Sequence, residues 1–162
     1  MKTENDKTSV VIQQLADLLN KGNAHVSLDD ALKDIPFEML AKTPVGLPYS
    51  IWQLAEHIRI AQWDILEFCV SSNHISPKWP EGYWPQNDSL KDEDQWQNCI
   101  HQIQSDRKKF VQLLHNAGDA IYTAFDYGQG QSLLKEALVL ADHNSYHTAE
   151  IVIVRRILNI WR

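Results

Sequence analysis

The chain has little cysteine and no long apolar run, and both absences narrow what it can be. Cys69 and Cys99 are its two cysteines in 162 residues, and they stand far apart. They form neither a disulfide framework nor a Cys-x-x-Cys zinc or redox motif, so we expect two small buried thiols. No apolar run approaches the roughly 18 residues that a membrane-spanning helix needs. The N-terminus is polar and acidic with no apolar segment behind it, which predicts a cytoplasmic protein without a leader.

Basic residues are also scarce, which argues against a nucleic-acid partner. The chain carries 15 lysines and arginines against 21 acidic residues, a net charge of −6 at pH 7. Binding to a phosphate backbone needs a basic patch, so we expect no nucleic-acid partner and, without a membrane span, no membrane partner. The longest basic runs, 107–109 and 155–156, fall within helical patterns and are interpreted as solvated helix faces.

No segment alternates apolar and polar residues as a strand does, and no repeat of roughly 20–50 residues is visible. Helical periodicity bounded by capping residues, glycine and proline predicts helices instead. The four long helices are predicted over residues 10–21, 50–71, 91–116 and 132–160. A short helical turn is predicted from Ser27 to before Pro36. An ordinary apolar fraction of 44% supports one globular domain over 1–162. The predicted fold class is therefore all-α, a bundle of four long helices.

The connection between the second and third long helices is rich in proline and aromatic residues. Residues 73–89 contain three prolines and a glycine, which exclude a helix or a central strand. They also contain Trp79, Tyr83 and Trp84, too aromatic for a disordered linker, so we expect an ordered crossover. These 17 residues can span roughly 55 Å, against about 33 Å for the 22-residue helix before them. The crossover can therefore let the next helix lie parallel to the previous one.

Two histidines of the last helix are spaced as metal ligands. His143 and His147 stand four apart, a separation that turns through about 400° of helix and rises about 6 Å. Both imidazoles then leave one face and can bind one metal ion, although two unrelated histidines fit the same spacing. His57 lies near the middle of the second long helix, at a depth where facing helices converge. Three imidazoles with open positions beside them is the pattern of a catalytic metal site.

Three blocks of the sequence resemble the DinB/YfiT-like metalloenzyme family, in helix order over about residues 8–162. They are WQLAEHI (52–58), KWPEGYWP (78–85) and HNSYHTAEIV (143–152), the last followed by two arginines. The resemblance implies a four-helix bundle in an up-down-down-up arrangement. It also implies a divalent metal, zinc or nickel favoured, held by His57, His143 and His147. Some members of the family transfer a low-molecular-weight thiol to an electrophile, and many have no demonstrated activity.

The chain departs from the family at one place beside the pair. The family commonly has Gly-Gln one residue after the second histidine, and here Ala149-Glu150 stands there. Glu150 shares the face of His143 and His147. It could be a fourth ligand, an acceptor for an imidazole N–H, a general base, or a plain exposed acid. Asp64 could likewise polarise a ligand or stabilise a bound cation, or be a solvated helix acid.

The sequence gives little indication of a functional role for the remaining histidines. Four of them stand in loops or beside polar neighbours and are expected to be exposed, namely His25, His74, His101 and His115. The tryptophans are expected to pack in the core and loops. Trp79, Tyr83 and Trp84 could also wall one side of a pocket at the mouth of the bundle.

The favoured function is a metal-dependent transferase or hydrolase acting on a small molecule, with thiol transfer as the preferred reaction. A divalent ion lowers the pKa of a bound thiol or water, and the chain has no nucleophile motif such as Gly-x-Ser-x-Gly. Two alternatives stay open: a non-catalytic metal- or ligand-binding stress-response module, and a structural homodimer with a vestigial site. The apolar residues 151–154 and 157 could serve both core and dimer interface, so a homodimer is expected.

Overall fold

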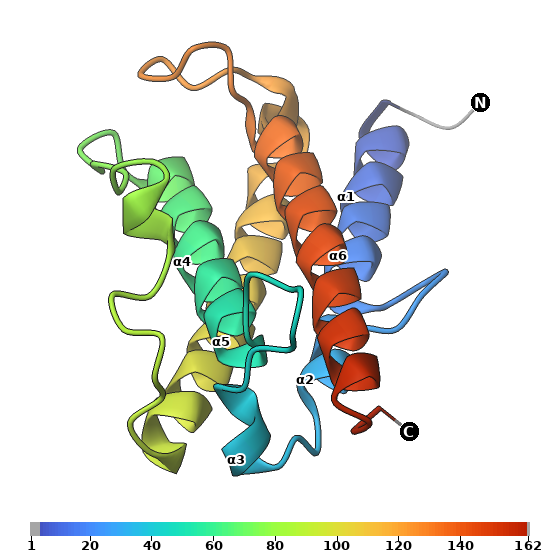
Figure 1. The fold of residues 1–162 in the computed structure, drawn as a ribbon. Coiled ribbons are helices and arrows are strands. Elements are labelled where there is room, and N and C mark those ends of the chain that lie inside the picture. The colour runs from blue at the N-terminus through green and yellow to red at the C-terminus, as the bar shows by residue number, and fades with distance from the viewer. Residues whose placement is uncertain (1–3, 162) are drawn as a thin grey trace.

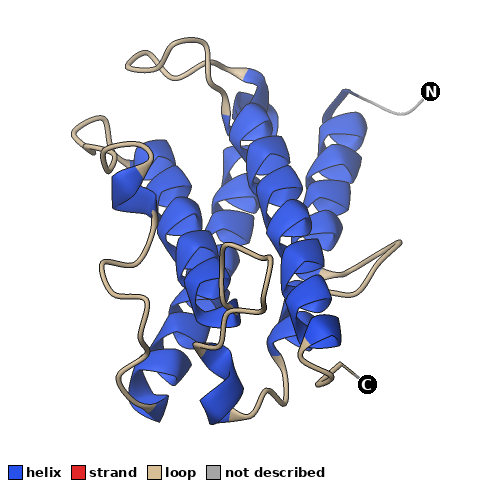
Figure 2. Ribbon diagram, in the orientation of Figure 1, coloured by secondary structure: helices blue, strands red, loops and turns tan. Residues whose placement is uncertain are grey.

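A computed structural model describes residues 4–161, with side chains from residue 7 onward, and no strand occurs in this part of the chain. Residues 1–3 and 162 of the predicted domain lie outside the described residues. Figure 2 shows helices joined by loops alone, which confirms the all-α prediction. The α-helices are α1 (Glu4–Asn20), α2 (Leu28–Leu32), α3 (Phe37–Leu40), α4 (Ile51–Val70), α5 (Glu93–Ala117) and α6 (Leu133–Ile157). Two 3₁₀ turns, η1 (Glu81–Tyr83) and η2 (Gly118–Tyr122), lie in the connections.

The four long helices stand side by side, and α4 packs against both α5 and α6 (Figure 1). In that view α1 and α6 run downward, whereas α4 and α5 run upward. The crossover after α4 descends along the outside of the molecule to the start of α5, so α4 and α5 are parallel, as its length permits. None of the described helices combines the length and apolar character that crossing a membrane requires.

Helix α4 is the element that the sequence predicts best. Ser50 is its N-cap: the hydroxyl accepts from Gln53 N at 3.2 Å, and Gln53 Oε1 accepts from Ser50 N at 2.9 Å. This reciprocal capping box satisfies two backbone donors that the first turn leaves without helical partners. Apolar residues at helical spacing face inward, with Ile51, Leu54 and Ile58 at most 1% exposed. His57 belongs to the same buried face.

The predictions for the first and last helices were partly wrong. Helix α1 begins at Glu4 rather than near residue 10, because nothing in the sequence before Thr8 breaks a helix. The last helix ends at Ile157 rather than at residue 160, and its apolar residues Leu138 and Ile153 are 50% and 48% exposed. Apolar residues occur on all sides of α6, so their period does not single out one face. The buried apolar residues of α6 are Leu133, Ala137, Leu140, Ile151, Val152 and Val154.

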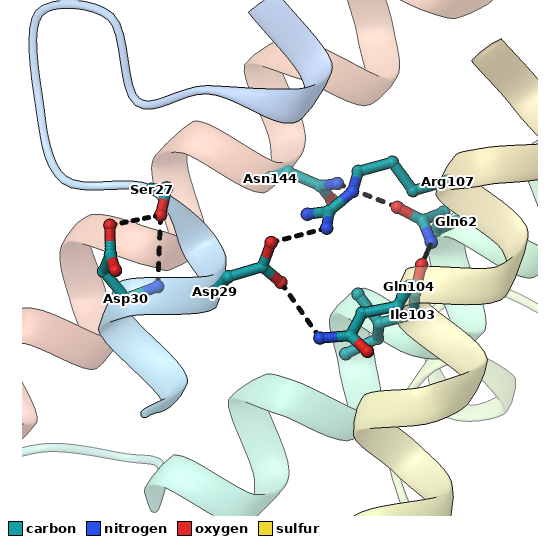
Figure 3. A network of polar contacts seen from close by, with 8 residues as sticks. All are labelled: Ser27, Asp29, Asp30, Gln62, Ile103, Gln104, Arg107 and Asn144. Atoms are coloured by element: carbon teal, nitrogen blue, oxygen red, sulfur yellow. Dashed lines mark hydrogen bonds and ion pairs between the residues drawn. The ribbon is translucent and has the colours of Figure 1, made fainter. Parts of the chain in front are cut away.

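Two arginines predicted to lie on solvated helix faces instead tie long helices to the short helix α2. Arg107 of α5 donates from Nη2 to Asp29 Oδ2 at 2.6 Å (Figure 3). Arg155 of α6 is 5% exposed and donates from Nη1 to the carbonyl oxygen of Ala31 at 2.7 Å. Sequence patterns miss both contacts because the acceptors are more than 70 residues away in the chain.

A buried amide joins three of the long helices at mid-height. Gln62 of α4 is fully buried, and its Nε2 donates to the carbonyl oxygen of Ile103 on α5 at 2.6 Å. Its Oε1 accepts from Nδ2 of Asn144 on α6 at 3.1 Å, and Figure 3 shows Gln62 lying between the two partners. Because buried amides are costly without partners, this pair of bonds sets the register of α4 against its neighbours.

The cap of α4 yields a prediction for stability. Ser50→Ala removes the hydroxyl acceptor of the first turn and should lower the free energy of unfolding by about 1 kcal/mol. Urea unfolding followed by far-ultraviolet circular dichroism measures the difference. Ser72→Ala, at an exposed position just beyond α4, should leave the midpoint unchanged. Equal midpoints for Ser50→Ala and the unaltered protein would contradict a stabilising cap.

Candidate metal centre

The three histidines singled out by the sequence meet in one cluster. His57 comes from the middle of α4, and His143 and His147 come from consecutive turns of α6. The Nε2 atom of His57 lies 3.1 Å from Nε2 of His147 and 3.1 Å from Nε2 of His143. One nitrogen from each ring lies within 4.8 Å of the other two. The cluster therefore joins two helices. Its closest histidines in the sequence from the two helices, His57 and His143, are 86 residues apart.

The outer nitrogens of two of the rings are held by fixed acceptors. His57 Nδ1 lies 2.8 Å from the carbonyl oxygen of Tyr83, which can only accept, so Nδ1 carries the proton. His147 Nδ1 lies 2.6 Å from Oε2 of Glu150, which sets the same tautomer. Both neutral rings then direct the unprotonated Nε2 into the cluster. His143 makes a longer contact, 3.5 Å from Nδ1 to Asn144 Oδ1.

This donor set fits a divalent metal ion. Two unprotonated Nε2 atoms 3.1 Å apart cannot hydrogen-bond to each other, so they need a shared cation or proton. Nitrogen ligands about 2.05 Å from one ion are about 3.3 Å apart in tetrahedral geometry and about 2.9 Å apart in octahedral geometry. The two distances from His57 Nε2, 3.1 Å each, lie between these values, and the three ligand nitrogens all lie within 4.8 Å of one another. Three imidazole nitrogens suit zinc, nickel, copper and iron alike.

Burial keeps these imidazoles neutral, the form that binds a metal. Desolvation lowers the pKa of His147 from 6.5 to about 4, with the neighbouring His57 adding to the effect. Desolvation also lowers the pKa of His143 to about 4, aided by the other two rings. The pKa of His57 is lowered too, mainly by burial. At pH 7 no proton has to leave before an ion can bind.

The aromatic crossover packs directly on His57. The Trp84 ring stacks on the imidazole of His57, with centroids 4.2 Å apart and planes 5° apart. Tyr49 stacks on Trp84 at 4.0 Å, which extends the stack toward the chain before α4. Tyr83 and Trp84 therefore lie against the site, as the sequence suggested. Trp79 does not reach it: its side chain is 68% exposed and contacts Tyr83.

Asp64 and His74 are both largely buried, so the predicted exposure of His74 is wrong and Asp64 is not the solvated helix acid that was one of its open alternatives. Asp64 is 7% exposed, and its Oδ1 lies 2.7 Å from Nε2 of His74, whose side chain is 9% exposed. Its Oδ2 accepts from the hydroxyl of Tyr83 at 2.5 Å. Asp64 stands seven residues beyond His57, on the same face of α4. Its partners could not be found because they come from the crossover. His25, His101 and His115 are exposed, as predicted.

Glu150 adopts one of the four arrangements that the sequence left open. Its carboxylate accepts the Nδ1–H of His147 and lies at the opposite edge of that ring from Nε2. The side chain is 33% exposed, so Glu150 is not a plain surface acid. Partial burial raises the pKa of this carboxyl, and the neighbouring His57 opposes that rise. In this position Glu150 orients His147 and increases the basicity of its inward nitrogen.

Neither family models, nor curated proteins, nor solved structures give a match to this chain. The metal centre is therefore argued from the geometry of its own residues. That geometry consists of three converging nitrogens, two fixed tautomers and a buried setting.

Burial of the histidines predicts a pH-dependent stability for the metal-free protein. The unfolded chain protonates His143 and His147 near pH 6.5, whereas the folded chain does so near pH 4. Between these values the unfolded state binds more protons, so the free energy of unfolding should fall as pH drops from 6.5 to 4. Urea unfolding in the presence of a chelator at pH 7.0 and pH 4.5 measures the change.

A matched double variant isolates the histidines from the carboxyl groups. His143→Gln with His147→Gln removes both titrating rings and should show a smaller loss of stability between the same two pH values. An equal loss in the variant would mean that other groups cause the pH dependence.

Proposed function

We propose that this chain is a divalent-metal-binding helical bundle of the DinB-like family. In this proposal α1, α4, α5 and α6 are the up-down-down-up bundle of a single domain over residues 1–162. His57, His143 and His147 hold the ion, with zinc or nickel favoured. The observation that carries the proposal is the convergence of three Nε2 atoms, two of them on rings whose tautomer is fixed from outside.

We propose further that the site transfers a low-molecular-weight thiol to a small electrophile. A divalent ion with three protein ligands keeps positions for a substrate and lowers the pKa of a thiol or water beside it. The substrate thiol releases its proton to solvent, and its sulfur forms a bond to the electrophilic carbon. In a substitution the leaving group departs with the bonding electrons. In an addition the electrons of the double bond move to the neighbouring carbon, which takes up a proton from solvent. With water in place of the thiol, the same site would act as a hydrolase.

The properties of the two cysteines are consistent with a nucleophile that comes from the substrate, because neither cysteine can serve as one. Burial raises the pKa of Cys69 to about 12, and it also raises the pKa of Cys99. Neither thiol ionises near neutral pH, and both are buried, so neither can attack a substrate. Glu150 acts in this scheme through His147, since it accepts the Nδ1–H and sets the basicity of Nε2.

The wider setting of this proposal is a cytoplasmic protein with a small-molecule partner. A homodimer remains part of it, because Ile153 and Ile157 are 48% and 49% exposed on α6. We favour catalysis over a non-catalytic binding module for one reason. Glu150, which could have blocked an open position of the metal, lies instead beyond the outer edge of the His147 ring.

Metal content is the first test of this proposal. Untagged protein incubated with zinc or nickel should retain close to one equivalent of metal after gel filtration, and His147→Ala should lose it. Elemental analysis measures both. His115→Ala, an exposed histidine of α5, serves as the control and should bind like the unaltered protein. Absence of metal from the unaltered protein would exclude the proposed centre.

Thiol consumption tests the reaction itself. Metal-loaded protein should accelerate the loss of a low-molecular-weight thiol in the presence of at least one electrophile from a panel of alkyl halides, epoxides and activated alkenes. Glu150→Gln keeps an acceptor for His147 but removes the charge, and it should slow the reaction by about tenfold. The free thiol can be followed by a colorimetric assay. No acceleration with any thiol and electrophile by a fully metal-loaded protein would rule out the transferase.

A further inference from the structure

One residue of the crossover touches both the metal centre and a buried acid. The backbone carbonyl of Tyr83 accepts the Nδ1–H of His57 at 2.8 Å. The hydroxyl of the same residue donates to Oδ2 of Asp64 at 2.5 Å. Asp64 stands two turns beyond His57 on the same face of α4. Tyr83 thus spans the distance between a candidate ligand and a carboxylate that does not itself reach the cluster.

The carboxylate of Asp64 is wholly engaged with the crossover. Its second oxygen, Oδ1, lies 2.7 Å from Nε2 of His74, near the beginning of the crossover. The ring of His74 packs edge-on against Trp63 of α4 at 5.3 Å. Asp64 therefore holds the crossover at two points that are nine residues apart, His74 and Tyr83. A buried carboxylate is costly unless it is hydrogen-bonded, and these two donors offset the cost of burying Asp64.

The hydroxyl of Tyr83 stays protonated in this environment. Burial raises the pKa of Tyr83 to about 12, and the hydrogen bond to Asp64 adds to the rise. The hydroxyl is therefore a permanent donor to the carboxylate. Because the carbonyl and the ring belong to one residue, fixing the ring at Asp64 also restricts where the carbonyl can point.

The same restriction governs the ring plane of His57. Trp84, the next residue in the chain, stacks on the imidazole with planes only 5° apart. The carbonyl of Tyr83 sets which nitrogen of His57 carries the proton, and Trp84 sets the tilt of the ring. Both contacts come from two consecutive residues, and the first of them bonds Asp64 through its hydroxyl.

We propose that Asp64 is a positioning residue for the metal centre. Through the Tyr83 hydroxyl and His74 it fixes the crossover, so that the Tyr83 carbonyl and the Trp84 ring hold His57 with Nε2 directed at the ion. This inference rests on the proposed metal-binding function. It assigns a role to a side chain that lies outside the ligand set and contacts no ligand directly.

Two conservative variants and one control test this role. Tyr83→Phe removes only the hydroxyl, and Asp64→Asn keeps the shape of the acid but can accept only one of the two donors. Asp106→Asn changes a matched buried carboxylate, 1% exposed, which bonds Gln102 and Lys109 of its own helix. Zinc dissociation constants from competition with a chromogenic chelator, and visible spectra of the cobalt(II)-loaded proteins, are compared among all four proteins.

We expect zinc binding to weaken by about 10- to 100-fold in Tyr83→Phe and Asp64→Asn. The cobalt(II) absorption bands should also change in position or intensity, because the geometry around His57 changes. Asp106→Asn should keep the affinity and the spectrum of the unaltered protein. If Asp64→Asn does not fold, Tyr83→Phe carries the test alone. Unchanged affinity and spectrum in Tyr83→Phe, or an equal loss in Asp106→Asn, would overturn the inference.

A metal-free measurement separates this inference from the proposed function. In the metal-free protein, the Nδ1–H of His57 should give a downfield proton resonance that is protected from exchange with water. It should be lost or exchange faster in Tyr83→Phe and remain in Asp106→Asn. A protected proton that depends on Tyr83, in a protein that binds no metal, would refute the metal centre but keep the positioning of His57. Metal binding with a proton indifferent to Tyr83 would refute the positioning alone.

Discussion

The structure depends on keeping three imidazole nitrogens close together inside a helical protein, two of them unprotonated. Such nitrogens repel one another, and their rings lose solvation when buried. The arrangement is tenable because the opposite edges of two rings donate to fixed acceptors, the carbonyl of Tyr83 and the carboxylate of Glu150. A cation at the centre would offset the remaining repulsion. The acceptors outside the cluster therefore decide which nitrogen of these two rings faces its centre.

Contacts beside the cluster also align the long helices. Helix α4 supplies His57 and also Gln62, whose amide reaches α5 through the Ile103 carbonyl and α6 through Asn144. Asn144 neighbours His143, so the bond that aligns α4 with α6 lies one residue from a candidate ligand. The crossover closes the other side by stacking Trp84 on His57. Register between helices and orientation of the rings are thus set by overlapping contacts.

Sequence reasoning succeeded where the signal is local. The caps and periodicity of α4 depend on neighbours within four residues, and the i, i+4 spacing of His143 and His147 is a property of one helix. It failed where the environment comes from distant segments. Asp64 and Arg155 look like ordinary surface charges in the sequence, yet both are buried. Asp64 bonds a hydroxyl and an imidazole of the crossover, and Arg155 bonds a backbone carbonyl of α2. Nothing in their immediate sequence distinguishes them from solvated side chains.

The sequence by itself determined the helical class, the limits of α4 and the identity of the three histidines that share a site. Hydrogen bonding within one helix and side-chain periodicity act over a few residues, so they can be read directly from the chain. Only the tertiary structure decided which nitrogen of His57 faces inward, that Glu150 holds His147, and that Asp64 anchors the crossover. Those outcomes depend on hydrogen bonds between atoms brought together by packing, and their geometry exists only in the folded molecule.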